Sequence, residues 1–355
     1  MKNNNFKWIL VLLIVIVLGI VFAFANKNDG EKIKVGLIMP LTGPAASITD
    51  DLQKSVKMYG ERAKNIQFVA QDDQCTGKGA LSAYNILKSQ GIKVYVVACS
   101  GSILALAPVV KEDGNVIMTG FGGSIEIRKT GDEVIRFIPD GLSISENLVN
   151  IVKQNPDQKY VLMHEKQDYS QSAGDFLISQ VGSQIVSRIT YASDAVSYRS
   201  ELSKLKDLKY DEIIFIPVAD GATKIILGEM GELGISNKIL GDVNVCDKLS
   251  MISKFDIHGQ CLKTVLKSDG YNKYISDFKM KYRHEPTYPF YNAVTFDVLN
   301  FIDKSLDGVE VVDSDRVKLL KNKALAGIDG AMTSYKFQSN GDVVSRKDYL
   351  EVTEF

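Results

Sequence analysis

Short apolar runs alternate with amphipathic stretches along the chain from residue 32 onward. The apolar runs cover residues 33–39, 67–70, 94–98, 116–118, 160–163, 185–189 and 213–217. The helical stretches between them cover residues 52–63, 79–87, 103–111, 144–152, 172–181, 201–208 and 223–233. The order of strand, helix and strand predicts parallel βαβ units. Apolar and polar residues do not alternate within the runs, which is typical of strands buried on both faces. The predicted fold class is α/β with doubly wound parallel sheets.

A break in this pattern at residues 137–141 divides the chain. A predicted strand ends there in the turn residues Pro139, Asp140 and Gly141, and a new strand–helix series begins at Tyr160. We interpret the break as a boundary between two lobes. A length of 355 residues agrees with this division, since one core of ordinary size needs fewer.

The last third of the chain is richer in predicted helix. Tyr274, Phe278 and Tyr282 recur at the four-residue spacing of one helix face, which is more typical of a core than of a ligand site. Alternating residues on either side of Asn340-Gly341 predict a hairpin.

Residues 1–25 form a separate segment. Lys2 and Lys7 precede an unbroken apolar run at 8–22, and Ala23-Phe24-Ala25 follows. This order predicts a secretory signal that is cleaved after Ala25. The alternative is an uncleaved membrane anchor, because the 18 apolar or small residues at 8–25 just suffice to span a bilayer. In both cases the rest of the chain lies outside the cytoplasm.

Composition and charge exclude several classes of protein. Apolar residues make up 45% and charged residues 24%, the balance of a globular protein rather than a disordered or fibrous one. The 42 Lys and Arg residues nearly balance the 43 Asp and Glu residues, so no net positive field would attract nucleic acid. We therefore expect no nucleic-acid partner.

Four cysteines, an even number in an exported chain, indicate disulfides. Three connectivities are open. The local one joins Cys75 to Cys99 and Cys246 to Cys261. Each bond would close a loop and stabilise the folded state by about 3 kcal/mol. Zinc is the less favoured interpretation because the three histidines are scattered without ligand spacing, and no metal site is predicted.

The turns that follow the predicted strands are the expected ligand sites, since helix N-termini and backbone N–H groups gather there. After the strand at 94–98 come Ser100, Gly101 and Ser102 at the start of a helix, an arrangement suited to a carboxylate. For Ser102 alone, an N-cap is the alternative. After the strand at 116–118 comes a glycine-rich turn, which lets the backbone approach a ligand closely.

Motifs of catalysis are incomplete. The glycine-rich turn lacks the third glycine of a dinucleotide site, because Ile125 occupies that position. Ser100 does not fit a nucleophile elbow, since Ala98 and Ser102 stand where glycines are needed. The acids at 72–73 lack a third metal ligand and fit a solvated turn. We therefore expect a protein that is not an enzyme and needs no cofactor.

Five segments, in order, resemble the type I periplasmic binding proteins of the leucine/isoleucine/valine-binding family, the substrate-binding proteins of branched-chain amino acid ABC transporters. They are residues 34–46 (KVGLIMPLTGPAA), 71–75 (QDDQC) with Ala80, the pair Cys75 and Cys99 at the family's disulfide positions, 164–170 (HEKQDYS) and 327–342. The resemblance implies two doubly wound parallel-sheet lobes that are joined by three crossings, with a ligand cleft between them.

The resemblance also implies roles for single residues. Ser100 falls on the family's serine that holds the ligand α-carboxylate, and Tyr169 falls on the second-lobe aromatic that closes over the ligand. Gly122 and Gly123 stand where the family usually has Ala-Thr, so the threonine hydroxyl is missing unless Ser124 replaces it.

Further positions match the family in part. Ile48 stands where an aromatic often covers the site, Asp220 lies near a ligand-contacting position, and Asp242 or Asn244 lies where the family places the acid that pairs with an ammonium. The candidate ligand-binding residues are therefore Ser100, Gly101, Ser102, Gly122, Gly123, Ser124, Tyr169, Asp220 and Asn244.

The implied lobes are residues 31–141 plus 266–332 and residues 142–265 plus 333–355. The implied function is that of an extracytoplasmic, monomeric solute-binding protein. It would close over a small polar ligand, such as an amino acid or an amide, and deliver it to the membrane permease of an ABC transporter. The alternative is a membrane-tethered ligand-sensing receptor domain that uses the same cleft.

Overall fold

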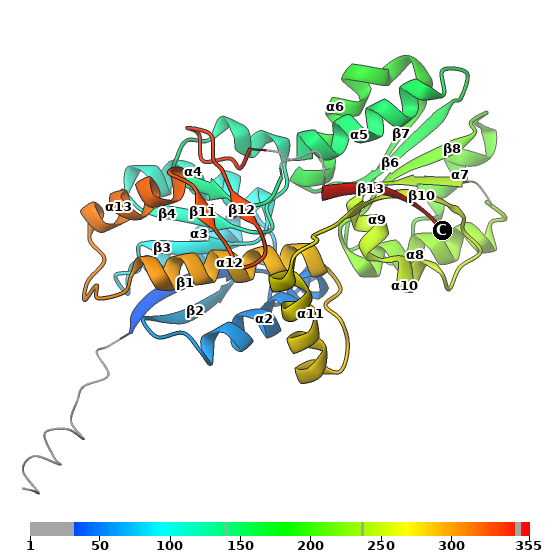
Figure 1. The fold of residues 1–355 in the computed structure, drawn as a ribbon. Coiled ribbons are helices and arrows are strands. Elements are labelled where there is room, and N and C mark those ends of the chain that lie inside the picture. Colours follow the sequence, from blue (N-terminus) through cyan, green and yellow to red (C-terminus); the bar gives the residue numbers. More distant parts are fainter. Residues whose placement is uncertain (1–31, 140, 236–237, 345–348) are drawn as a thin grey trace, which may run out of the picture.

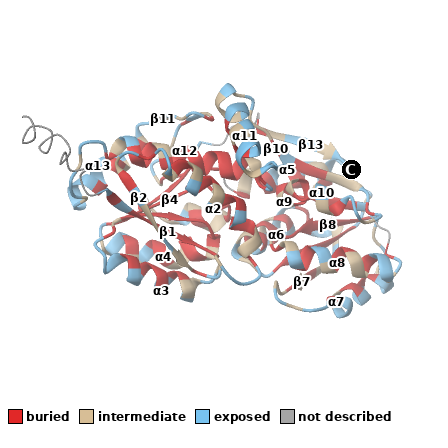
Figure 2. Cartoon of the chain, turned by 90° about the horizontal axis from the view of Figure 1, so that it is seen from below, coloured by how far each residue is buried: buried red, intermediate tan, exposed pale blue. Residues whose placement is uncertain are grey.

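Two α/β lobes lie side by side in the computed structural model (Figure 1), which describes residues 32–139, 141–235, 238–344 and 349–355. Figure 2 shows buried residues concentrated on the strands of both sheets and on the inner sides of the helices. The predicted signal or anchor at 1–25 lies outside the described residues. Among the helices of the described ranges, none combines the length and the apolar character that a bilayer span requires.

The first lobe contains a parallel five-stranded sheet in the order β2-β1-β3-β4-β5. Its strands are β1 (Ile33–Met39), β2 (Ile66–Asp72), β3 (Val94–Val97), β4 (Val116–Thr119) and β5 (Val134–Arg136). Its helices are α2 (Ala46–Gly60), α3 (Gly77–Lys88), α4 (Ser100–Glu112), the 3-10 helix η1 (Ile125–Lys129), α11 (Asp269–Tyr282), α12 (Pro289–Ser305) and α13 (Ser314–Leu325).

Residues of β1 face two different helical layers. Val35 and Leu37 belong to the core cluster that includes α2 and α12, whereas Ile38 belongs to the cluster that includes α3 and α4. A strand covered on both faces has no solvent side, which explains why the apolar runs lack alternation. The prediction of a doubly wound α/β fold is confirmed.

The second lobe contains a six-stranded sheet in the order β13-β10-β9-β8-β6-β7. Its strands are β6 (Tyr160–Glu165), β7 (Ile185–Tyr191), β8 (Glu212–Ile216), β9 (Lys238–Gly241), β10 (Gly259–Thr264) and β13 (Leu350–Glu354), of which only β13 pairs antiparallel. Its main helices are α5 (Gly141–Gln154), α6 (Asp168–Val181), α7 (Arg199–Ser203), α8 (Asp220–Glu232), α9 (Val243–Asp247) and α10 (Leu249–Ile252).

The chain passes between the lobes after β5, after β10 and before β13. Before the last passage, Asp342 pairs with Arg136 of β5 through a backbone bridge and an ion pair of 2.8 Å. Residues 334–343 therefore stay with the first lobe, and the return falls later than the predicted boundary at residue 333. The other lobe bounds remain predictions.

The structure confirms two local predictions and corrects a third. The local disulfides are present, with Cys75 bonded to Cys99 and Cys246 bonded to Cys261. The aromatic stripe lies on α11, where Tyr274 and Phe278 are buried in the core as predicted. The helix predicted at 201–208 is shorter, because α7 ends at Ser203 and a 3-10 helix, η3 (Lys204–Asp207), follows.

Candidate functional site

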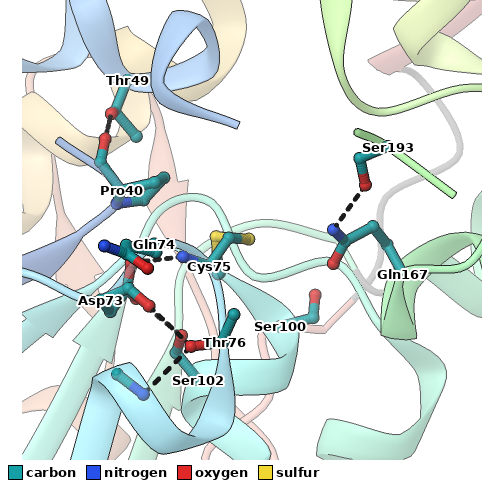
Figure 3. The surroundings of a disulfide bond; sticks show 12 residues. Pro40, Thr49, Asp73, Gln74, Cys75, Thr76, Ser100, Ser102, Gln167 and Ser193 are labelled. Carbon is teal, nitrogen blue, oxygen red and sulfur yellow. Dashed lines mark hydrogen bonds between the residues drawn. A yellow bond between two sulfur atoms is a disulfide. The ribbon is translucent and has the colours of Figure 1, made fainter. Parts of the chain in front are cut away.

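The first-lobe part of the site is built from the turns after β3 and β4. Helix α4 begins at Ser100, and its first i→i−4 hydrogen bond is that of Ile103 to Cys99, so the preceding N–H groups have no partner within the helix. The Ser100 hydroxyl accepts a hydrogen bond of 3.0 Å from the N–H of Ser124, which joins the two turns. Figure 3 shows Ser100 beside the Cys75 disulfide, with Gln167 of the second lobe opposite.

Two of the predicted ligand residues face the first-lobe interior instead. Ser102 is fully buried and donates a hydrogen bond of 2.6 Å to Asp73, which fixes the turn after β2 (Figure 3). A Cβ on Gly122 would lie 2.2 Å from the Ile103 side chain, so Gly122 serves close packing. Ile48 is likewise buried in the core.

Helix α6 of the second lobe begins against both turns. A Cβ on Gly101 would lie 2.3 Å from a carboxylate oxygen of Asp168, and a Cβ on Gly123 would lie 2.9 Å from the Tyr169 ring. The Ser124 hydroxyl donates a hydrogen bond of 3.1 Å to Ser172. The two lobes are therefore in contact at the predicted carboxylate site.

Tyr169 connects this contact to an acid of the second lobe. Its hydroxyl donates a hydrogen bond of 2.9 Å to Asp242, which directly follows β9 and caps α9. The backbone N–H and the side-chain amide of Asn244 also donate to Asp242, at 3.1 and 3.0 Å. Burial raises the pKa of Asp242 to about 7 despite these donors. Such a carboxyl group would gain from a cationic ligand group.

A second contact between the lobes involves Asp220. The hydroxyl of Tyr288, which directly precedes α12, donates a hydrogen bond of 2.8 Å to Asp220. The ammonium of Lys248 lies 3.4 Å from the same carboxylate and 4.9 Å from the centre of the Tyr288 ring. Lys248 is only 2% exposed. The predicted residue Asp220 is thus held between a tyrosine of one lobe and a lysine of the other.

Sequence reasoning missed the aromatic side of the site. The Phe121 ring lies 5.2 Å from that of Tyr291 and 6.1 Å from that of Tyr288, so these first-lobe rings form an aromatic wall. The available signal was Pro289, which marks a helix start and is flanked by aromatic residues. Lys248 and Asp247 were also missed, because they lie in a short helical segment without a recognisable motif.

The fold and the contacts between the lobes define a two-lobed binding protein whose polar and aromatic groups gather where the lobes meet. Residues 32–244 match the periplasmic binding protein family, and the chain belongs to this family. This confirms the family resemblance that the sequence motifs indicated.

Two curated relatives match part of the chain. One is the Leu/Ile/Val-binding protein of Escherichia coli K12, which is 26% identical over 165 residues, or 43% of this chain and 44% of that protein. The other is the Leu/Ile/Val-binding protein homolog 3 of Brucella melitensis, which is 25% identical over 183 residues, or 48% of this chain and 49% of that protein. The chain therefore spans about half the length of these relatives.

Solved structures share the fold over nearly the whole chain. The branched-chain amino acid transporter substrate binding protein of Streptococcus pneumoniae, solved with isoleucine, has a TM-score of 0.76 and 17% identity over 91% of this chain and 100% of that chain. An ABC transporter solute binding protein of R. palustris, solved with benzoate, has a TM-score of 0.76 and 16% identity over 90% and 92%. These likenesses confirm the two-lobed type I fold.

Proposed function

We propose that this protein is an extracytoplasmic solute-binding protein that closes its two lobes over a small polar ligand and delivers it to the permease of an ABC transporter. The observation that carries the proposal is the meeting of α4 and α6. The N-terminus of one helix and the first turn of the other, from different lobes, enclose the same polar turns. Family membership and the transporter components among the structural relatives support the same role.

The chemistry of the site favours a ligand with a carboxylate and an ammonium. The N–H groups at the start of the 13-residue helix α4 and the Ser100 hydroxyl are suited to a carboxylate. Asp242, with Tyr169 beside it, is suited to an ammonium. Because Gly123 has no side chain, recognition of a ligand at this turn would come from backbone N–H groups.

A thermal-shift screen of amino acids, amides and organic acids, followed by calorimetry of the hits, tests this proposal. Bound ligand should raise the melting temperature, because it binds the folded state alone. Ser100→Ala should weaken binding of a carboxylate ligand by about 1 to 3 kcal/mol, the value of a hydrogen bond to a charged group.

Ser102→Ala is the matched control, since it removes the same hydroxyl two residues further along the helix. It should lower the melting temperature through the loss of the Asp73 hydrogen bond and leave affinity unchanged. The proposal fails if no compound in the screen shifts the melting temperature, or if the two variants affect affinity equally.

A further inference from the structure

Acidic residues end three neighbouring strands of the second lobe at the edge that faces the first lobe. Glu165 is the last residue of β6, Asp220 begins the helix after β8, and Asp242 directly follows β9. Asp247 lies one turn beyond Asp242, at the end of α9. The ammonium of Lys248 contacts this group through Asp220. The acidic edge, defined as these four acids, therefore carries more negative than positive charge.

Two oxygens of the acidic edge are buried without a hydrogen-bond donor among the described residues. They are Oε1 of Glu165 and Oδ2 of Asp247. The other oxygen of Glu165 accepts from the N–H groups of Val218 and Ala219, so this side chain is fixed in place. An acceptor that is buried without a donor costs about 1 to 3 kcal/mol, and more when it is charged. Such oxygens are suited to N–H groups of a ligand.

One polar side chain that is almost fully buried adds to this evidence. The hydroxyl of Tyr191 makes no hydrogen bond within the described residues, and this residue is 1% exposed. Tyr191 ends β7, beside Glu165 of β6. Asp220, to which the Tyr288 hydroxyl of the opposite lobe donates a hydrogen bond of 2.8 Å, belongs to the same edge. The unsatisfied groups thus gather at the boundary between the lobes.

The surface opposite the acidic edge is aromatic. Phe121, Tyr288 and Tyr291 form the wall described above, and a ring face attracts cations. The ammonium of Lys248 already lies over Tyr288. Carboxylates on one side and rings on the other form surroundings that favour a positively charged group and disfavour a second carboxylate.

We propose that the ligand is an amino acid with a basic side chain, whose cationic group donates N–H bonds to Asp247 and Glu165 between the acidic edge and the aromatic wall. This inference rests on the proposed function. The ammonium of Lys248 contacts Asp220, and the ligand α-ammonium would pair with Asp242, which leaves the unbonded oxygens of Asp247 and Glu165 for the side-chain cation. An aliphatic side chain would leave both of their unsatisfied oxygens buried.

Two pairs of ligands test this inference on the unaltered protein. L-arginine and L-citrulline have nearly the same shape but differ in charge, as do L-lysine and L-norleucine. Calorimetry should show the cationic member of a pair binding about 10- to 100-fold more tightly, the range for hydrogen bonds between charged groups. Equal or tighter binding of the neutral members, or of L-leucine or L-glutamate, would overturn the inference and leave the proposed function intact. If no amino acid binds, this inference fails, whereas the proposed function fails only if the amides and organic acids of the screen do not bind either.

A variant pair assigns the effect to Asp247. Asp247→Asn should lower the affinity for L-arginine by about tenfold or more and change the affinity for L-citrulline little, because the amide keeps the shape and loses the charge. Asp256→Asn removes the same charge in the same lobe from a side chain that is 97% exposed, and it should leave both affinities unchanged. Equal effects of the two variants would show a long-range charge effect and exclude a contact with Asp247.

Discussion

Asp247 is a carboxyl group whose surroundings favour the protonated form. Burial raises its pKa to about 8, although the positive charge of Lys248 opposes the rise. The groups that act on it electrostatically come from several elements, and they are Asp242, Lys248, Lys263, Tyr169, Tyr271, Tyr288 and Tyr291. A cation placed beside Asp247 would lower this pKa again, so ligand binding near pH 7.5 should release protons.

The raised pKa makes a prediction about stability in the absence of ligand. Between pH 3.8 and about 8 the folded protein retains a proton that the unfolded chain has lost, so the contribution of Asp247 to stability falls as pH rises through this range. Asp247→Asn removes the titration. The melting temperature of the variant minus that of the unaltered protein should therefore increase from pH 5 to pH 8.5, by about 2–4 °C for each kcal/mol of stability that the unaltered protein loses.

Scanning calorimetry across this pH range measures the difference. Asp277→Asn serves as control, because it removes a surface carboxylate that pairs with a lysine and not with a histidine, and it should give a constant difference. A constant difference for Asp247→Asn as well would contradict a raised pKa at this position.

At the scale of elements, a buried arginine holds the glycine-rich turn to the rest of the first lobe. Arg136, at the end of β5, is fully buried and donates hydrogen bonds to the carbonyl oxygens of Ser124 and Gly122, at 2.7 and 3.4 Å. It also donates to Asp342 at 2.8 Å, in the segment that precedes the last crossing. One side chain thus fixes the site turn and the return of the chain together.

Asp342→Ala should therefore destabilise the protein strongly. Removing one partner of a buried ion pair leaves the other charge without compensation, which costs about 3 to 5 kcal/mol. Thermal unfolding followed by circular dichroism measures the loss. Asp277→Ala, which breaks an ion pair on the surface of α11, should leave the melting temperature nearly unchanged. Similar effects of both variants would contradict the role given to Arg136.

The sequence predicted elements better than it predicted which way their side chains face. Strands such as β1 and β4 were predictable because burial on both faces leaves a continuous apolar run. Ser100 and Ser102 show the limit. The same turn predicted both as ligand residues, but two positions along a helix are about 200° apart, so Ser102 faces Asp73 while Ser100 faces the turn after β4.

Residues that depend on the meeting of the lobes were the hardest to predict. Tyr288 and Lys248 are 40 positions apart and come together only because α12 of one lobe begins beside α9 and α10 of the other. No local pattern encodes this proximity. The family resemblance supplied Tyr169 and Asp242, whose hydrogen bond the structure shows, but their role toward a ligand remains a prediction.

At the scale of the whole molecule, closure depends on close approach between the lobes at a few small residues. Gly123 lies close against the Tyr169 ring of the other lobe. This ring is fixed in place, because its hydroxyl donates a hydrogen bond to Asp242. Asp168, by contrast, meets Gly101 with the end of an exposed side chain that can turn away. Gly123 is therefore the position at which an added methyl group tests closure.

Gly123→Ala should hinder closure and leave each lobe folded. Gly123 is not among the glycines with positive φ, so alanine is compatible with the backbone, but its Cβ would lie 2.9 Å from the Tyr169 ring. We expect the affinity for the tightest-binding amino acid to fall about tenfold, which corresponds to 1.4 kcal/mol. Small-angle scattering should show less compaction on addition of that amino acid than in the unaltered protein.

Gly231→Ala, on α8 where a Cβ meets nothing within 4 Å, is the matched control and should bind and compact normally. If Gly123→Ala also binds and compacts like the unaltered protein, the contact between Gly123 and Tyr169 does not belong to the closed, ligand-bound state.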